Sequence, residues 1–171
     1  MDLLKNNIEK ICSFYVSDWH LVTMILPYIN KQINEKANII TILENDIEEN
    51  VKTLISKLNL KNEENILNID WKGKQTIKYP EIKKIMKTLK SGEELNIILI
   101  NGNKNYIDII NKNIDQYFSE YQINDKVHIK IINCYEVGEF NFNIKEILEN
   151  HDKILNTSGE KEILDVFEGY A

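Results

Sequence analysis

The sequence contains no arginine: all 21 of its basic residues are lysines, and 27 acidic residues bring the net charge to -6. Arginine supplies the forked donor that pairs with guanine and with phosphate, and an acidic surface repels the nucleic-acid backbone. We therefore expect no direct binding to nucleic acid.

Long apolar runs and cysteine are also scarce. No apolar stretch approaches the roughly 18 residues that a membrane span needs, and no basic stretch followed by an apolar run opens the chain, so we expect a cytoplasmic protein with no membrane contact. The two cysteines, Cys12 and Cys134, lie in apolar, strand-like runs where a free thiol behaves as a small buried hydrophobe. A disulfide is not expected in that compartment.

Spacings typical of metal or nucleophile sites are missing. The three histidines (His20, His128 and His151) are scattered, and the chain has no His-x-x-x-His, Cys-x-x-Cys or G-x-S-x-G spacing. We therefore expect no metal, no cofactor, no catalytic residue and no enzymatic activity.

What the sequence does contain is an alternation of short apolar runs with longer helical patterns, which is typical of a parallel sheet with crossover helices. The predicted fold is a three-layer, doubly wound α/β domain with a mostly parallel sheet of at least five strands, at residues 11–15, 38–43, 66–70, 95–101 and 127–135. Residues 38–43 and 95–101 are apolar on both alternating sets of positions, so we expect both to be central. The domain covers residues 1–156.

Residues 157–171 are predicted to form a C-terminal helical tail. A possible capping box runs from Thr157 to Glu160, and Ile163, Leu164, Val166 and Phe167 share one helical face. This tail packs either on its own domain or on a partner, which could be a second copy of the chain.

The turn after the first strand, "YVSDWH", lacks the glycines and the lysine of a phosphate-binding loop. Ser17 or Asp18 is predicted to cap the following helix, and the carboxylate of Asp18 would repel a phosphate there. "WKGKQ" at 71–75 is interpreted as a surface turn. The alternative is a phosphate contact, because lysines flank its single glycine. Asp70, at the end of a predicted strand, occupies the place where nucleotide hydrolases of this layout keep a magnesium-binding acid. Because the phosphate-binding loop is missing, we expect a structural or binding role instead.

Two stretches, "KICSFYVSDWHLVTMILPYINKQI" and "INCYEVGEFNFNIKEILENHDKIL", resemble the opening and the end of the MEDS domain, the methanogen/methylotroph DcmR sensory domain. Lys10 stands where that family often has histidine. The resemblance implies a RecA/KaiC-like fold without a phosphate-binding loop, similar to sensory modules proposed to bind small organic molecules. The positions that carry it are Cys12, Tyr15, Asp18, Pro27, Tyr28, Cys134, Tyr135, Phe140 and His151.

Open α/β sheets bind ligands outside the carboxyl ends of their strands, so we place the candidate site there. It would bind a small organic ligand and signal through a signalling or transcription-regulating partner, with a homodimer as a further possibility. The alternative is a degenerate NTPase-fold adaptor that binds only protein. The candidate ligand-binding residues are Cys12, Tyr15, Asp18, Trp19, Asp70, Trp71, Cys134, Tyr135 and His151.

Overall fold

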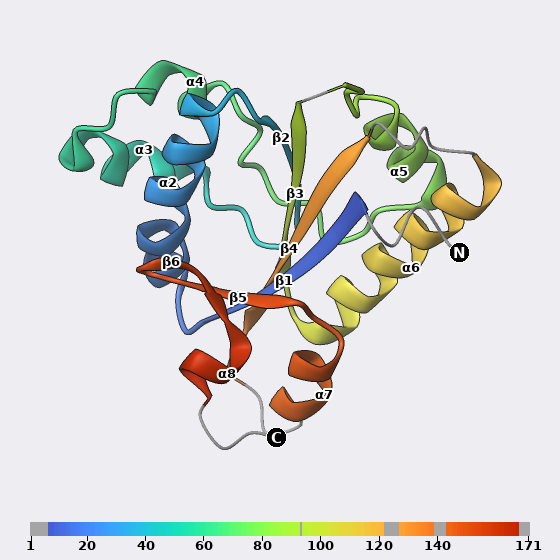
Figure 1. Cartoon of the computed structure of the whole chain (residues 1–171). Helices are drawn as coiled ribbons and strands as arrows, with labels where there is room; N and C mark the ends of the chain where they lie inside the picture. Colours follow the sequence, from blue (N-terminus) through green and yellow to red (C-terminus); the bar gives the residue numbers. More distant parts are fainter. Residues whose placement is uncertain (1–6, 93, 122–126, 139–142, 168–171) are drawn as a thin grey trace.

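In the computed structural model, residues 7–92, 94–121, 127–138 and 143–167 are described (Figure 1). The strands are β1 (Ile8–Tyr15), β2 (Asn38–Leu43), β3 (Leu95–Gly102), β4 (His128–Glu136), β5 (Lys153–Asn156) and β6 (Gly159–Glu162). The helices are α2 (Asp18–Asn34), α3 (Glu48–Leu58), α4 (Glu63–Leu67), α5 (Tyr79–Met86), α6 (Lys104–Glu120), α7 (Ile144–Glu149) and α8 (Ile163–Val166).

The strands form one sheet in the order β2-β3-β4-β1-β5-β6, and only the β5–β6 pair is antiparallel. Helices α2, α3 and α4 cover one face of the sheet, and α5 and α6 cover the other (Figure 1). We call these the α2 face and the α6 face. The predicted fold class, a three-layer, doubly wound α/β domain with a mostly parallel sheet, is confirmed.

Strand β2 lies at the edge of the sheet, so the prediction that it is central is wrong. The coil that follows α4 covers this edge: the N–H of Lys74 donates to the Leu43 carbonyl at 2.6 Å, and the Thr41 hydroxyl donates to the Asp70 carbonyl. Gly73 permits this close approach, because a Cβ there would lie 2.5 Å from the Asp46 nitrogen. Because the coil covers the edge of β2, this strand can be apolar on both alternating sets of positions although it lies at the edge of the sheet.

The predicted strand at 66–70 is also wrong. Ile66 belongs to the short helix α4, and the chain then runs as coil through Asp70. The indole N–H of the buried Trp71 donates to the Ile66 carbonyl at 2.8 Å, which holds the coil against the end of the helix. A short apolar run is too brief to show whether its periodicity is that of a strand or of a buried helical turn. In the structure this run forms a short helix followed by coil.

The predicted helical tail is wrong in its first half. Residues 159–162 form β6, which pairs with β5 across the two-residue turn Thr157–Ser158, and Gly159 has a φ of 101°. Only Ile163–Val166 is helical. Ile163 and Phe167 pack against the domain's own core, whereas Leu164 is 59% exposed. A two-residue turn followed by glycine therefore forms a hairpin here, in place of the helix that the capping box predicted.

Helix α2 begins where the sequence predicts. The Ser17 side chain accepts from the His20 N–H at 3.1 Å, so Ser17 and not Asp18 is the cap. The helix is continuous through Pro27. Pro27 is exposed, so water can reach the carbonyl that the proline leaves without a donor.

Both cysteines are fully buried free thiols on neighbouring strands. Their side chains pack on opposite faces of the sheet, Cys12 on the α6 face and Cys134 on the α2 face. They therefore fill the core.

Within the described residues, none of the helices has both the length and the apolar character that crossing a bilayer requires.

Candidate functional site

The carboxyl ends of the strands are joined by one asparagine. The Asn45 side-chain amide donates to the Tyr15 hydroxyl at 2.8 Å and to the Glu136 carboxylate at 2.9 Å. Its backbone N–H donates to the buried Asn101 side chain at 3.1 Å. Asn45 therefore links the ends of β1, β3 and β4.

The electrostatics of this edge are acidic. Burial raises the pKa of Asp18 above its usual range, and the nearby carboxylates of Glu136 and Asp46 raise it further. Ser17 already satisfies an N–H group at the start of α2. An anionic ligand would meet like charge there, so this edge disfavours phosphate.

Trp71, Tyr15 and Tyr135, which the sequence analysis placed in one site, do not all lie on the same side of the sheet. Trp71 and Tyr15 are buried in the core of the α2 face, whereas Tyr135 is buried in the core of the α6 face. Because successive side chains on a strand point to opposite faces, Tyr15 and Tyr135 are separated by the sheet itself. Burial raises the pKa of both phenols, so both stay protonated.

Two other predicted site residues lie at the surface. Trp19 is 49% exposed on the first turn of α2. Asp70 is exposed, and its carboxylate accepts from the Lys72 N–H at 3.0 Å within a local turn. Because Asp70 does not end a strand, the sheet does not carry it to the carboxyl edge.

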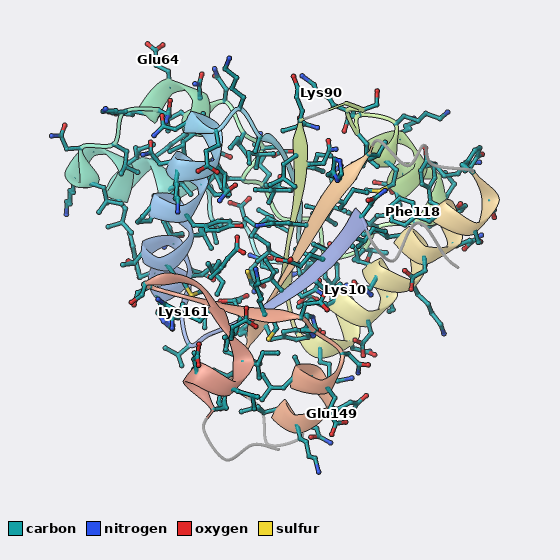
Figure 2. All side chains as sticks on the ribbon, viewed as in Figure 1. Lys10, Glu64, Lys90, Phe118, Glu149 and Lys161 are labelled. Atoms are coloured by element: carbon teal, nitrogen blue, oxygen red, sulfur yellow. The ribbon has the colours of Figure 1, made fainter. Side chains whose placement is uncertain are left out.

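A cavity of about 440 Å³ lies between α6, α7 and the α6 face of β1 and β4; we call it the α6–α7 cavity. It brings together two of the predicted residues, Tyr135 and His151, whose ring centroids are 5.9 Å apart in an edge-to-face contact. Lys10 of β1, labelled in Figure 2, adds an ammonium group to the lining. The cavity lies on the flank of the sheet, beside the carboxyl half of β4.

Uncharged polar side chains form the floor of this cavity. The buried Asn133 amide donates to Nε2 of His151 at 3.0 Å, and the Asn111 amide donates to Oδ1 of Asn133 at 2.9 Å. Nδ1 of His151 lies 2.6 Å from the Ile147 carbonyl in α7. We call Asn111, Asn133 and His151 the amide–imidazole network.

The network determines the proton position on His151. A carbonyl oxygen can only accept, so Nδ1 carries the proton and donates to Ile147, while Nε2 accepts from Asn133. Burial lowers the pKa of His151 below its ordinary value, and the charge of Lys10 lowers it further. His151 is therefore neutral at physiological pH, with both ring nitrogens engaged.

Charged groups at the rim pair with one another. Lys104, at the start of α6, lies 2.7 Å from the Asp108 carboxylate and 3.5 Å from that of Glu146 in α7. The second of these pairs connects α6 to α7 across the cavity. The described residues contain no group of three or more His, Cys, Asp or Glu side chains placed to hold a metal ion.

The sequence-based prediction missed Asn111 and Asn133. Asn133 is the second residue of "INCY" in a strand that is otherwise buried, and a buried amide in such a strand is a signal for a polar partner. Asn111 gives no comparable signal, because an asparagine on an amphipathic helix is ordinarily solvated. Phe140 lies outside the described residues.

No family model matches this chain, and no curated protein matches it. Among solved structures, the chain is similar to one described as an ATPase domain, with a TM-score of 0.47 and 13% identity over 86% of this chain and 68% of that chain. A similarity of this degree carries no information about activity. The resemblance to the MEDS domain stays a prediction.

Proposed function

We propose that this chain is a non-catalytic sensory module that binds a small, neutral, polar organic molecule in the α6–α7 cavity and acts through a protein partner. The observation that carries the proposal is the amide–imidazole network, an ordered set of uncharged polar groups that faces a cavity. A buried network of this kind costs desolvation, so its placement beside a cavity favours a role in recognition.

The volume and the chemistry of the cavity support this class of ligand. About 440 Å³ falls within the range of roughly 300–1,000 Å³ typical of small-molecule sites. The side-chain oxygens of Asn111 and Asn133 each accept one bond within the network, and an amide oxygen has two lone pairs. The remaining lone pairs suit a ligand that donates from hydroxyl or N–H groups.

A non-catalytic role is supported by the state of the titratable groups. Both nitrogens of His151 are engaged, so this histidine is poorly placed to take a proton from a substrate. At the carboxyl edge, Asp18, Asp46 and Glu136 disfavour a bound phosphate. Neither feature suits a nucleotide hydrolase.

Signalling through a partner is supported by the connections of the cavity floor. His151 holds the Ile147 carbonyl of α7 and directly precedes the segment that leads into β5 and β6. The β5–β6 hairpin continues into α8, where Leu164 is 59% and Val166 40% exposed. A ligand that moved His151 would thus act on the elements that carry this apolar surface.

One observation favours the alternative, an adaptor that binds protein and no small molecule. Val16 is 68% and Trp19 is 49% exposed at the turn between β1 and α2. Exposed aromatic and aliphatic side chains beside an acidic edge are a plausible contact for a basic partner.

The test is mass spectrometry of small molecules released by gentle denaturation of the purified protein. We expect a released compound from the wild type and a loss of at least about tenfold for Asn111→Ala, because the ligand would lose polar contacts. Asn113→Ala, two residues along the same helix and outside the cavity lining, is the matched control and should retain the compound.

Two results would overturn the proposal. The first is no compound from the wild type together with a protein that copurifies and is lost in Trp19→Ser, which favours the adaptor. The second is a compound that both asparagine variants retain, which removes the cavity as its site.

A further inference from the structure

Lys10 of β1, labelled in Figure 2, is a half-buried cation in the lining of the α6–α7 cavity. Within the described residues, its ammonium group forms neither an ion pair nor a hydrogen bond, whereas Lys104 in the same lining pairs with Asp108 and Glu146. A half-buried charge without a counter-charge is unfavourable, so a ligand group that accepts a hydrogen bond would stabilise Lys10.

The backbone of Lys10 is held by the strands around it. Its N–H donates to the Asp152 carboxylate at 2.8 Å, and its carbonyl accepts from the Asp152 N–H at 2.7 Å. On the other side, β1 pairs with β4, and Lys10 lies opposite Ile131. The point from which the lysine side chain starts is therefore fixed by the sheet, as a selective site requires.

The amide N–H groups on the floor of the cavity are already engaged. The N–H₂ group of Asn111 donates to the Ile107 carbonyl at 2.9 Å and to Oδ1 of Asn133 at 2.9 Å. The N–H₂ group of Asn133 donates to Nε2 of His151 at 3.0 Å and to Oδ1 of Asn111 at 3.4 Å. Each amide oxygen accepts one of these bonds and keeps a second lone pair. The floor therefore offers acceptors to a ligand, and Lys10 offers donors.

Lys10 and the floor lie on the same side of the sheet. Cys12, two residues after Lys10, lies opposite Asn133 and packs on the α6 face, so Lys10 points to that face as well. Adjacent strands are about 4.8 Å apart and each residue rises about 3.3 Å, which places the Cα atoms of Lys10 and Asn133 about 8 Å apart. The ammonium group and the amide oxygens are thus within the span of one small ligand.

Three kinds of ligand group can be compared at this place. A carboxylate would pair with Lys10 but has no donor for the amide oxygens. An ammonium group would donate to those oxygens, but Lys10 would repel it and would stay unpaired. A primary carboxamide has two N–H donors beside a carbonyl acceptor, and it carries no charge.

Taking the proposed function as the basis, we propose that the ligand of the α6–α7 cavity carries a primary carboxamide and that Lys10 selects it. The N–H₂ group of the ligand donates to the amide oxygens of Asn111 and Asn133, and its carbonyl accepts from the Lys10 ammonium group. Lys10 therefore determines which polar group is accepted, and the amide–imidazole network provides the surface on which it lies.

The test is NMR titration of the isotope-labelled full chain with benzamide, benzoate and benzylamine, followed at the side-chain amide signals of Asn111 and Asn133. The three probes share a phenyl ring, which suits the apolar lining of Tyr135 and Ile147, and they differ in their polar group. We expect benzamide to bind saturably and each of the other two to bind about tenfold more weakly, because each leaves either Lys10 or the amide oxygens unpaired.

Two lysine variants test the role of Lys10. Lys10→Met keeps an unbranched side chain and the backbone hydrogen bonds. It should weaken benzamide about tenfold and strengthen benzylamine, because the repelling charge is gone. Lys112→Met, on the exposed rim of the same cavity, is the matched control and should leave the binding of benzamide unchanged.

Three results would overturn this proposal: no saturable binding of benzamide, benzoate or benzylamine binding as tightly as benzamide, or benzamide binding that Lys10→Met leaves unchanged. If the wild type still releases a compound that Asn111→Ala loses, the proposed function stands and only the carboxamide is wrong. If the wild type releases no compound, the proposed function fails as well.

Discussion

Each face of the sheet holds a polar cluster, and the two clusters differ in charge. On the α6 face, Asn111, Asn133 and His151 form a network without a formal charge. On the α2 face, Lys130 and Glu160 form an ion pair at 2.8 Å, with side chains only 22% and 17% exposed. A neutral network is inexpensive to desolvate and orders its donors and acceptors, whereas a buried ion pair needs both partners.

This difference separates two tasks. The ion pair joins β4 to β6, which attaches the hairpin to the sheet. The amide–imidazole network joins β4 to α6 and to the segment after α7, and it faces a cavity. We therefore expect changes on the α2 face to act mainly on stability, and changes on the α6 face to act on both stability and ligand.

The largest expected effect comes from breaking the ion pair on one side only. Lys130→Met should lower the free energy of unfolding by about 3 kcal/mol, because it leaves the Glu160 carboxylate half-buried without its nearest cation. Adding Glu160→Gln should restore more than half of this loss, since the pair is then replaced by uncharged groups. Urea denaturation of the three proteins measures both numbers.

A loss below about 1 kcal/mol for Lys130→Met would contradict the contrast between the faces, because it would mean that this pair behaves as a solvated surface pair.

A smaller effect is expected from Asn133→Leu, which has a similar volume but removes the centre of the neutral network. It leaves Nε2 of His151 and the Asn111 amide without one partner each, and we expect a loss of about 2 kcal/mol. The same denaturation at low and high ionic strength should give the same loss, because no charge is removed. A strong salt dependence of the loss would show that the network is not neutral.

The smallest effect concerns pH. Burial lowers the pKa of His151 below its ordinary value of 6.5, so the folded chain takes up this proton less readily than the unfolded chain. The stability contributed by the neutral ring is present above pH 6.5 and is lost as the pH falls through the lower pKa of the folded state, by at most about 1.4 kcal/mol per pH unit.

His151→Gln is the matched variant for this pH effect, because glutamine cannot titrate. Thermal melts on both sides of pH 6.5 should show a smaller loss for the variant than for the wild type. Equal losses in the two proteins would show that other groups, such as the carboxylates, account for the acid sensitivity.

The layers of the fold could be predicted because apolar periodicity follows burial. Strands β2, β3 and β4 were placed to within one or two residues, and β1 begins three residues earlier than predicted. The errors share one physical cause: backbone pairing with another segment of the chain overrode the local pattern. The coil at 70–74 pairs with β2, and β6 pairs with β5, although the local sequence suggests a strand and a helix.

The candidate site was predictable only in part. Tyr135 and His151 do line one cavity, but Tyr15 and Trp71 lie on the other side of the sheet. The side of the sheet on which each side chain lies depends on the register of its strand and on whether residues 66–70 form a strand at all. One wrongly predicted strand therefore assigns its side chains to the wrong side of the sheet. Asn111 belongs to the site only because α6 packs over β4.

The central claim is that a small molecule occupies the α6–α7 cavity, and side-chain amide NMR of isotope-labelled protein tests it most directly. Spectra are compared before and after the protein is unfolded, dialysed and refolded, which removes any copurified compound. We predict that the amide signals of Asn111 and Asn133 shift and return when the released compound is added back, while that of Asn113 stays unchanged. Unchanged signals for Asn111 and Asn133, or equal shifts for all three asparagines, would contradict the claim.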